Sequence, residues 1–134
     1  MTPFGMKVRE LRKTREITLK KMAEELGVSA AYFSALEHGH RGQPGSGLVQ
    51  QICGYFDLIW DDAEELRRLA QLSHPRIVVD TSGLSPKATE LANTLAATIQ
   101  DLDDETIDGV RYLQQQLTYP QERHGREYAF AQIA

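Results

Sequence analysis

Residues 17–39 carry the sequence ITLKKMAEELGVSAAYFSALEHG, which predicts two short helices joined by a tight turn. Thr18 and Ser29 are predicted N-caps, because their side-chain oxygens can accept hydrogen bonds from the first free N–H groups of a helix. Gly27 tolerates the positive φ that ends the first of these helices, and Ala23 is small enough for the two helices to cross closely. This spacing predicts a helix-turn-helix unit.

The flanking segments predict three further helices around this unit. Residues 3–15 place apolar side chains on one face and basic side chains on the other. Residues 46–57 predict a fourth helix that buries Leu48, Ile52 and either Tyr55 or Phe56, and a fifth helix starts at the aspartates 61–62. The stretch between the third and fourth helices is rich in glycine and contains a proline, so it predicts a loop.

The C-terminal half has a different pattern. Residues 76–80, RIVVD, are mostly β-branched and too few for a helix, so they predict an extended segment or a short strand. Amphipathic helices are predicted to start at residues 85–86 and 103–104. Such helices are not stable alone in water, so their apolar stripes must pack on the first domain, on each other or on a second chain.

Charge is distributed unevenly along the chain. Residues 1–45 hold eight Lys or Arg against five Glu, whereas residues 46–134 hold seven Lys or Arg against fourteen Asp or Glu. The two parts therefore carry +3 and −7 within a net charge of −4. This asymmetry predicts an N-terminal face for a polyanion, because the local potential governs such an encounter more than the net charge does.

Composition and motifs argue against several other classes of protein. The single cysteine, Cys53, excludes an internal disulfide framework, and we interpret it as an inert core thiol. No apolar run approaches membrane-spanning length and no signal-peptide core is present, so we expect a soluble, cytoplasmic, nucleoid-associated protein. His38 and His40 lack further metal ligands, and no catalytic motif occurs. We therefore expect no enzyme activity, cofactor or metal.

Residues 4–58 resemble the Xre/Cro repressor family of lambda repressor-like DNA-binding domains. The similarity is carried by VRELR (8–12), ITLKKMAEELGVS (17–29) and YFSALEHG (32–39). The resemblance implies a five-helix fold in which the helix at residues 29–38 enters the major groove. It also implies an ion pair between Arg12 and Glu37, which occupy the positions where the family pairs its first helix with its recognition helix.

Two positions depart from the family pattern. Leu19 stands where the family usually has a phosphate-binding glutamine, and Glu16 stands where a glycine commonly precedes that helix. Alanines at the base-reading positions can touch only a thymine methyl, so we expect phosphate contacts and DNA shape to outweigh direct readout. Tyr32 is either a groove contact or a partly exposed packing residue. The residues expected to bind DNA are Lys20, Lys21, Ser29, Ala30, Ala31, Tyr32, Ser34, His38, His40 and Arg41.

The sequence thus predicts an all-α chain with a DNA-binding domain over residues 1–72. A helical oligomerisation module is predicted over residues 73–117, with the extended segment or short strand at 76–80, and a flexible tail over residues 118–134. The module is expected to form a homodimer through its apolar side chains. The residues assigned to this dimerisation are Ile77, Val79, Leu91, Leu95, Ile99, Leu102, Ile107 and Val110.

These features favour a bacterial or phage-type transcriptional regulator, in the first place a dimeric repressor of operator DNA. The alternative hypothesis is an antitoxin-like or anti-regulator module. In that case the acidic C-terminal half binds a protein partner, and DNA binding is secondary autoregulation.

Overall fold

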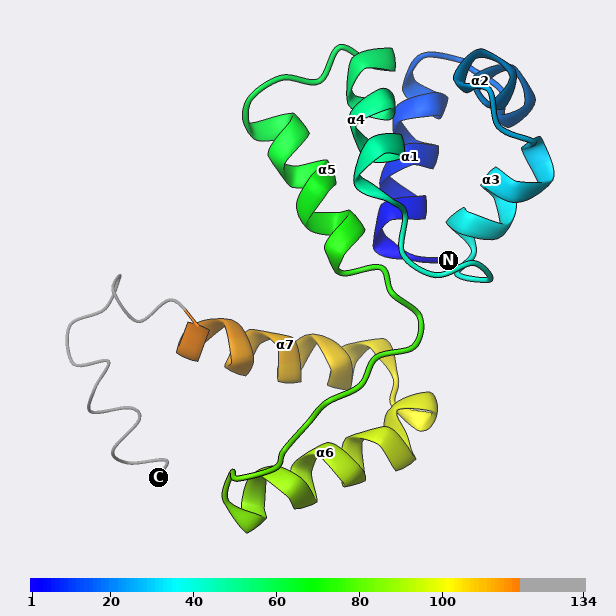
Figure 1. The fold of residues 1–134 in the computed structure, drawn as a ribbon. Coiled ribbons are helices and arrows are strands. Elements are labelled where there is room, and N and C mark those ends of the chain that lie inside the picture. Colours follow the sequence, from blue (N-terminus) through cyan, green and yellow to red (C-terminus); the bar gives the residue numbers. More distant parts are fainter. Residues whose placement is uncertain (119–134) are drawn as a thin grey trace. The chain divides into compact units, whose positions relative to one another are not determined.

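A computed structural model of the chain describes residues 1–118, which form two compact helical units (Figure 1). The first unit spans Met1–Val78 and the second begins at Val79. The helices of the first unit are α1 (Pro3–Thr14), α2 (Leu19–Leu26), α3 (Ala30–Glu37), α4 (Ser46–Tyr55) and α5 (Asp61–Gln71). The second unit contains α6 (Pro86–Thr98), the 3-10 helix η1 (Ile99–Asp101) and α7 (Asp104–Thr118). The prediction of an all-α fold with an N-terminal helix-turn-helix is confirmed, and the predicted tail lies outside the described residues apart from its first position.

Local capping explains where α2 and α3 begin and where α2 ends. The side chain of Thr18 accepts a hydrogen bond from Lys21 N at 3.1 Å, and that of Ser29 accepts one from Tyr32 N at 3.0 Å. Gly27 ends α2 with a φ of 75°. The two hydrogen bonds pair backbone N–H groups that the helices themselves cannot pair, and Gly27 adopts the left-handed conformation that ends α2. These three boundaries therefore follow from residues within one turn.

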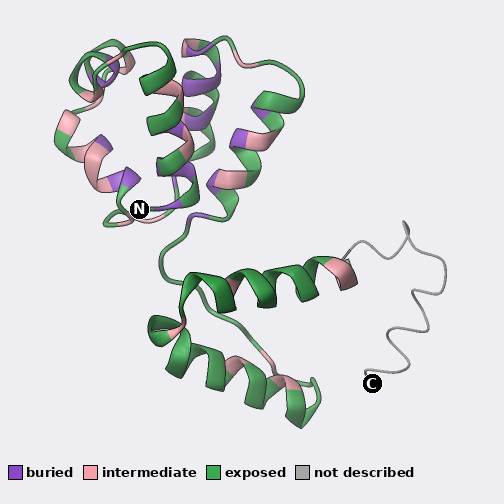
Figure 2. Ribbon diagram, turned by 180° about the vertical axis from the view of Figure 1, so that it is seen from behind, coloured by how far each residue is buried: buried purple, intermediate pink, exposed green. Residues whose placement is uncertain are grey.

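The core of the first unit lies between its five helices, where Figure 2 shows the buried residues gathered. It is built from Phe4 and Val8 of α1, Met22 and Ala23 of α2, Phe33 and Leu36 of α3, Val49, Ile52, Cys53 and Phe56 of α4 and its C-cap, and Ala63, Leu66 and Ala70 of α5. In α4 and its C-cap the predicted burial of Ile52, Cys53 and Phe56 is confirmed. Val49 is buried as well, whereas Leu48, which was predicted to be buried, is only half-buried. Leu48 and Val49 both lie at helical spacing from Ile52, and the packing of α4 against α5 decides that Val49 is the buried one.

The N-terminus is held against the ends of two other helices. Thr2 N and Thr2 Oγ1 donate hydrogen bonds to the carbonyl oxygen of Glu37 at 3.0 and 3.3 Å. Phe4 N donates to Ser73 Oγ at 2.9 Å, and Ser73 Oγ donates to the carbonyl oxygen of Leu69 at 2.6 Å. The beginning of α1 is therefore fixed by the C-terminal ends of both α3 and α5.

Over residues 79–118, the second unit has exposed apolar side chains in place of a core. No residue of α6 is buried, and Figure 2 shows α6 and α7 almost entirely as exposed surface. Of the side chains predicted to mediate dimerisation, only Leu102 and Ile107 are half-buried, and the other six are exposed. The apolar side chains of α6 and η1 therefore form no core within residues 79–118. No helix in the described part of the chain is long and apolar enough to cross a membrane.

Residues 76–80 form no strand, which rules out one of the two predicted alternatives, the short strand, and leaves the extended segment. The exposed fractions of Ile77, Val78 and Val79 are 74%, 95% and 62%. A strand is defined by hydrogen bonds to a neighbouring strand, and residues 1–118 contain no second strand that could supply them. These β-branched residues therefore have no neighbouring strand within residues 1–118.

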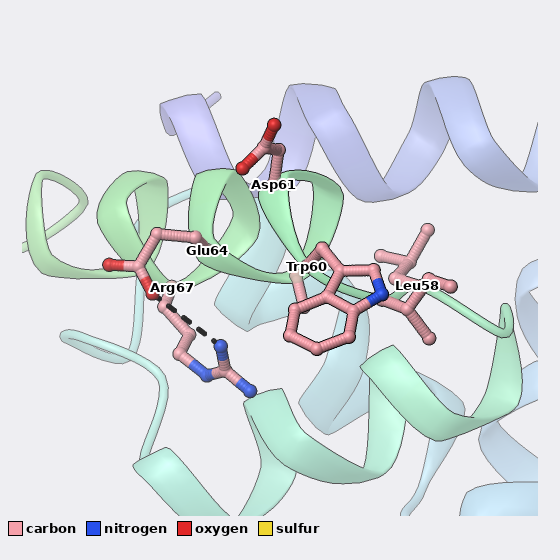
Figure 3. A pocket seen from close by; sticks show the side chains of 7 residues that line it. Leu58, Trp60, Asp61, Glu64 and Arg67 are labelled. Atoms are coloured by element: carbon pink, nitrogen blue, oxygen red, sulfur yellow. Dashed lines mark ion pairs between the residues drawn. The ribbon is translucent and has the colours of Figure 1, made fainter.

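Trp60 has a strained backbone at the start of α5. Its φ of 52° and ψ of −121° are typical of glycine, and its side chain is 85% exposed. Figure 3 shows the indole at the edge of a shallow pocket, which also contains the ion pair between Glu64 and Arg67 at 3.6 Å. The strain is therefore not offset by deep burial of the ring.

We expect Trp60→Gly to raise the free energy of unfolding by roughly 1 kcal/mol, because glycine adopts this conformation without strain and little apolar contact is lost. The measurement is urea denaturation followed by circular dichroism, since Trp60 is the only tryptophan and its fluorescence disappears with it. Trp60→Ala is the matched control, because it removes the ring but keeps the Cβ atom and should give no gain. A less stable glycine variant would show that the indole packs more strongly than its exposure indicates.

Candidate nucleic-acid interface

Helices α2 and α3 and the turn between them form the candidate interface. Ala23 is almost completely buried where α2 meets α3, and its carbonyl oxygen accepts a hydrogen bond from Val28 N at 3.0 Å. A larger side chain at this position would separate the two helices. The small residue and the left-handed Gly27 therefore set the angle at which α3 is presented.

Every residue predicted to bind DNA is accessible in this arrangement. Lys20 and Lys21 are exposed in the first turn of α2. Ser29, the N-cap of α3, and Ala31 are exposed, whereas Ala30, Tyr32 and Ser34 are half-buried. His38, His40 and Arg41 are exposed just after α3. The structure thus brings cationic side chains and the N-terminal end of α3 to the surface of one small domain.

The departure at Leu19 has a structural explanation. Leu19 is half-buried and packs against the hydrophobic core, so this position does not present a polar group to solvent. The neighbouring Lys20 and Lys21 lie at the same helix N-terminus, where free N–H groups and the helix dipole also favour an anion. The cationic side chains can therefore provide the attraction for phosphate that the family obtains from a glutamine.

Tyr32 connects α3 to the loop that follows it. The guanidinium of Arg41 lies 5.5 Å from the centroid of the Tyr32 ring, which is a cation–π geometry. Tyr32 also packs against the core, so its ring is held from the inner side by apolar residues and covered by a cation. This contact restrains Arg41 beside the beginning of α3.

The two histidines after α3 lie next to each other without forming a recognisable metal site. Their ring centroids are 6.4 Å apart in a stacked arrangement. His38 Nδ1 lies 2.8 Å from the carbonyl oxygen of Ser34, so this nitrogen carries the proton in that hydrogen bond. Among residues 1–118, no group of three or more His, Cys, Asp or Glu is arranged to hold a metal ion.

Arg12 and Glu37 are in contact beneath the interface. Arg12 Nη2 lies 3.1 Å from both carboxylate oxygens of Glu37, and the two side chains are only 12% and 3% exposed. Burial raises the pKa of Glu37, and the nearby charge and hydrogen bond of Arg12 oppose this effect. The Nε atom of Arg12 is buried without a hydrogen-bond partner. The pair therefore holds α1 against the end of α3 and makes no direct contribution to an exposed surface.

Gly5 and Arg15 also position α3 or its supporting helices, and sequence patterns did not identify them. A Cβ atom at Gly5 would overlap the backbone carbonyl of Glu37, so only glycine lets α1 approach α3 this closely. Arg15 donates a hydrogen bond to the carbonyl oxygen of Phe56 at 2.6 Å and lies over the Phe56 ring. Both contacts join residues that are distant in sequence, so local patterns contain no signal for them.

Comparisons with known proteins identify the same region. A family profile described as a helix-turn-helix domain matches residues 5–72. An uncharacterized HTH-type transcriptional regulator of Bacillus subtilis, RghRB, is 32% identical over 62 residues, which cover 46% of this chain and 45% of the relative. The HTH-type transcriptional repressor RghR of the same organism is 38% identical over 52 residues, covering 39% and 38% of the two chains. This chain therefore matches less than half the length of these curated relatives. No solved structure matches it.

Proposed function

Because the chain belongs to the Xre-like helix-turn-helix domain family, we propose that it is a transcriptional regulator that inserts α3 into the major groove of double-stranded DNA. The observation that carries this proposal is the accessible N-terminal end of α3 in the same helix-turn-helix unit as the exposed Lys20 and Lys21, with α3 held by the buried contact between Arg12 and Glu37. A rigidly supported helix with cations beside it is the arrangement that DNA docking requires.

The side chains divide into two groups with different roles. Lys20, Lys21, His38, His40 and Arg41 contact the phosphate backbone, which provides affinity and orientation. Ser29, Ala30, Ala31, Tyr32 and Ser34 face the base edges. Because this second group contains no Arg, Asn or Gln to make bidentate hydrogen bonds to base edges, sequence preference comes largely from thymine methyl groups and DNA shape.

The regulator acts as a homodimer and, in the simplest case, as a repressor. The exposed apolar residues of α6 and α7 support dimerisation, because such faces need a partner in water. Two domains in a dimer meet half-sites roughly one DNA turn apart, which multiplies a modest single-site affinity. The repressor name of one relative supports repression. The site of action is chromosomal DNA in the cytoplasm.

Fluorescence anisotropy of labelled DNA tests this function. The probe is a duplex from the region upstream of the protein's own gene, compared with a scrambled duplex at several salt concentrations. We expect tight binding to the first duplex only, and this binding persists at physiological salt. Equal and steeply salt-dependent binding to both duplexes would contradict specific regulation. Absence of binding would favour the protein-partner alternative.

Lys20→Ala should lower the slope of log K against log salt by about one unit, because it removes one phosphate contact and the counterion that this contact releases. Lys87→Ala is the matched control, since it removes the same charge from α6, outside the proposed interface. We expect its slope to equal that of the unmodified protein. Equal slopes for all three proteins would exclude Lys20 from the phosphate contacts.

A further inference from the structure

Residues Arg76–Asp80 have the properties of a strand that lacks its partner. The side chains of Ile77, Val78 and Val79 are β-branched and exposed. Within residues 1–118, the backbone N–H and C=O groups of these three residues make no hydrogen bond. We propose that this segment pairs with the same segment of a second copy as an antiparallel ribbon centred on Val78. The inference rests on the dimer of the proposed function and specifies how its two copies meet.

The order of residues in this segment is complementary to its own inverted copy. An antiparallel pair centred on Val78 places Val78 opposite its counterpart and Ile77 opposite Val79 of the second copy. It also places Arg76 opposite Asp80 of the second copy, and the two-fold symmetry repeats this ion pair at the other end. Each ribbon therefore contains three apolar pairs between two ion pairs.

Other arrangements of the same two segments lose this match. A parallel, in-register pair would place Arg76 beside Arg76 and Asp80 beside Asp80, so like charges would repel. A shift of the antiparallel register by one residue would place Arg76 opposite Val79 or Thr81. The charges are thus paired in one register only, and that register also buries β-branched side chains against each other.

Neighbouring residues fit the ends of such a ribbon. Pro75 precedes it and has no N–H group, so the hydrogen-bond ladder ends there. At the other end, Ser82 N donates a hydrogen bond to Asp80 Oδ1 at 2.8 Å, which orients the carboxylate and leaves its second oxygen for Arg76 of the other copy. In residues 1–118, neither Arg76 nor Asp80 has an ion-pair partner.

The ribbon adds specificity to a larger contact. A two-stranded pair of this length is only marginally stable in water, so it requires additional apolar burial. The exposed side chains of α6 and α7, among them Leu91, Leu95 and Ile99, supply apolar surface that the same dimer can bury. The helices thus contribute most of the apolar area, and the charge order of residues 76–80 sets the orientation of the two copies.

Reversal of the charges tests the register in the full-length chain. Sedimentation equilibrium measures the dimer dissociation constant of the unmodified protein, Arg76→Asp, Asp80→Arg and the double variant. We expect each single reversal to weaken the dimer on the order of tenfold, because symmetry creates two like-charge pairs. The double variant restores opposite charges at both ends and should return to within about threefold of the unmodified protein.

The outcomes separate the ribbon from the proposed function. A dimer that is unaffected by the single reversals, or not rescued in the double variant, overturns the ribbon and leaves the dimer intact. A monomer at every concentration overturns both the dimer and the ribbon. The anisotropy measurement independently reports DNA binding.

A cysteine at the centre of the ribbon gives a second measurement. We expect Val78→Cys to form a disulfide-linked dimer in mild oxidant, since opposite residues of an antiparallel pair have Cα atoms roughly 4.5–5.5 Å apart. Ser82→Cys is the control, because its two copies would lie beyond disulfide reach in this register. Cys53 is 5% exposed, so the unmodified protein should remain unlinked. Failure of Val78→Cys to cross-link in an intact dimer overturns the ribbon.

Discussion

Gly5→Ala should lower the free energy of unfolding of the first unit by about 3 kcal/mol, the upper end of the usual cost of overpacking, because the added methyl group overlaps a backbone atom. The overlapping atom is the carbonyl oxygen of Glu37, at the end of α3. A side chain could rotate away from such a contact, but this carbonyl is held by hydrogen bonds from Thr2 N and Thr2 Oγ1. Helix α1 must therefore move away from α3, which also separates Arg12 from Glu37.

Gly54→Ala is the matched control for this substitution. Gly54 lies in α4 of the same domain, and a Cβ atom there meets no atom within 4 Å. Alanine should stabilise the helix at this position by roughly 0.5–1 kcal/mol. Chemical denaturation of the two variants separates the close approach from the general effect of replacing glycine in a helix. If Gly5→Ala were as stable as the unmodified protein, α1 and α3 would not pack as described.

Arg12→Ala should cost about 3–5 kcal/mol of folding stability, because it leaves the Glu37 carboxylate buried without its cation. The measured quantity is the free energy of unfolding from urea titration. The double variant Arg12→Met/Glu37→Met should recover much of this loss, since it removes both charges and keeps apolar volume. A double variant as unstable as Arg12→Ala would show that the side chains stabilise the fold through other contacts.

Because Glu37 titrates, its contribution to the free energy of unfolding depends on pH. Burial raises the pKa of Glu37 above its ordinary value of 4.5, so the folded state holds this proton more tightly than the unfolded state. The resulting stabilisation is fully present below pH 4.5 and is lost as the pH rises through the raised value. Glu37→Gln cannot titrate, so the difference in unfolding free energy between it and the unmodified protein should change over this interval. A constant difference would show that the pKa of Glu37 is not raised.

The predictions for Gly5→Ala and Arg12→Ala concern the packing that supports α3 and not the exposed surface of this helix. Gly5 and Arg12 lie in α1, yet each fixes the position of Glu37 at the end of the helix proposed to enter DNA. A weakened support should therefore reduce DNA binding through loss of folding, with little change in sequence preference. Lys20→Ala should show the opposite pattern, because it changes the salt dependence in an intact fold.

The sequence alone determined the boundaries of α2 and α3 and the identity of the helix-turn-helix unit. Thr18 and Ser29 act as N-caps and Gly27 ends α2 as predicted, because capping involves only atoms within one helical turn. The accessible positions around α3 could also be predicted, since they follow from the helical period and the resemblance to the family. The contact between Arg12 and Glu37 was implied by that resemblance alone, because the two residues are 25 positions apart.

Tertiary structure decided the contacts that join distant residues. Phe4 and Ser73 are 69 positions apart, and only the folded chain brings the N–H of one to the hydroxyl of the other. The choice of Val49 over Leu48 as a buried residue of α4 depends on the surface of α5, since both residues fit the helical pattern of the sequence. Gly5 is required by a carbonyl group on another helix. Local propensities extend over a few residues, whereas close packing depends on the shapes of elements that meet only after folding.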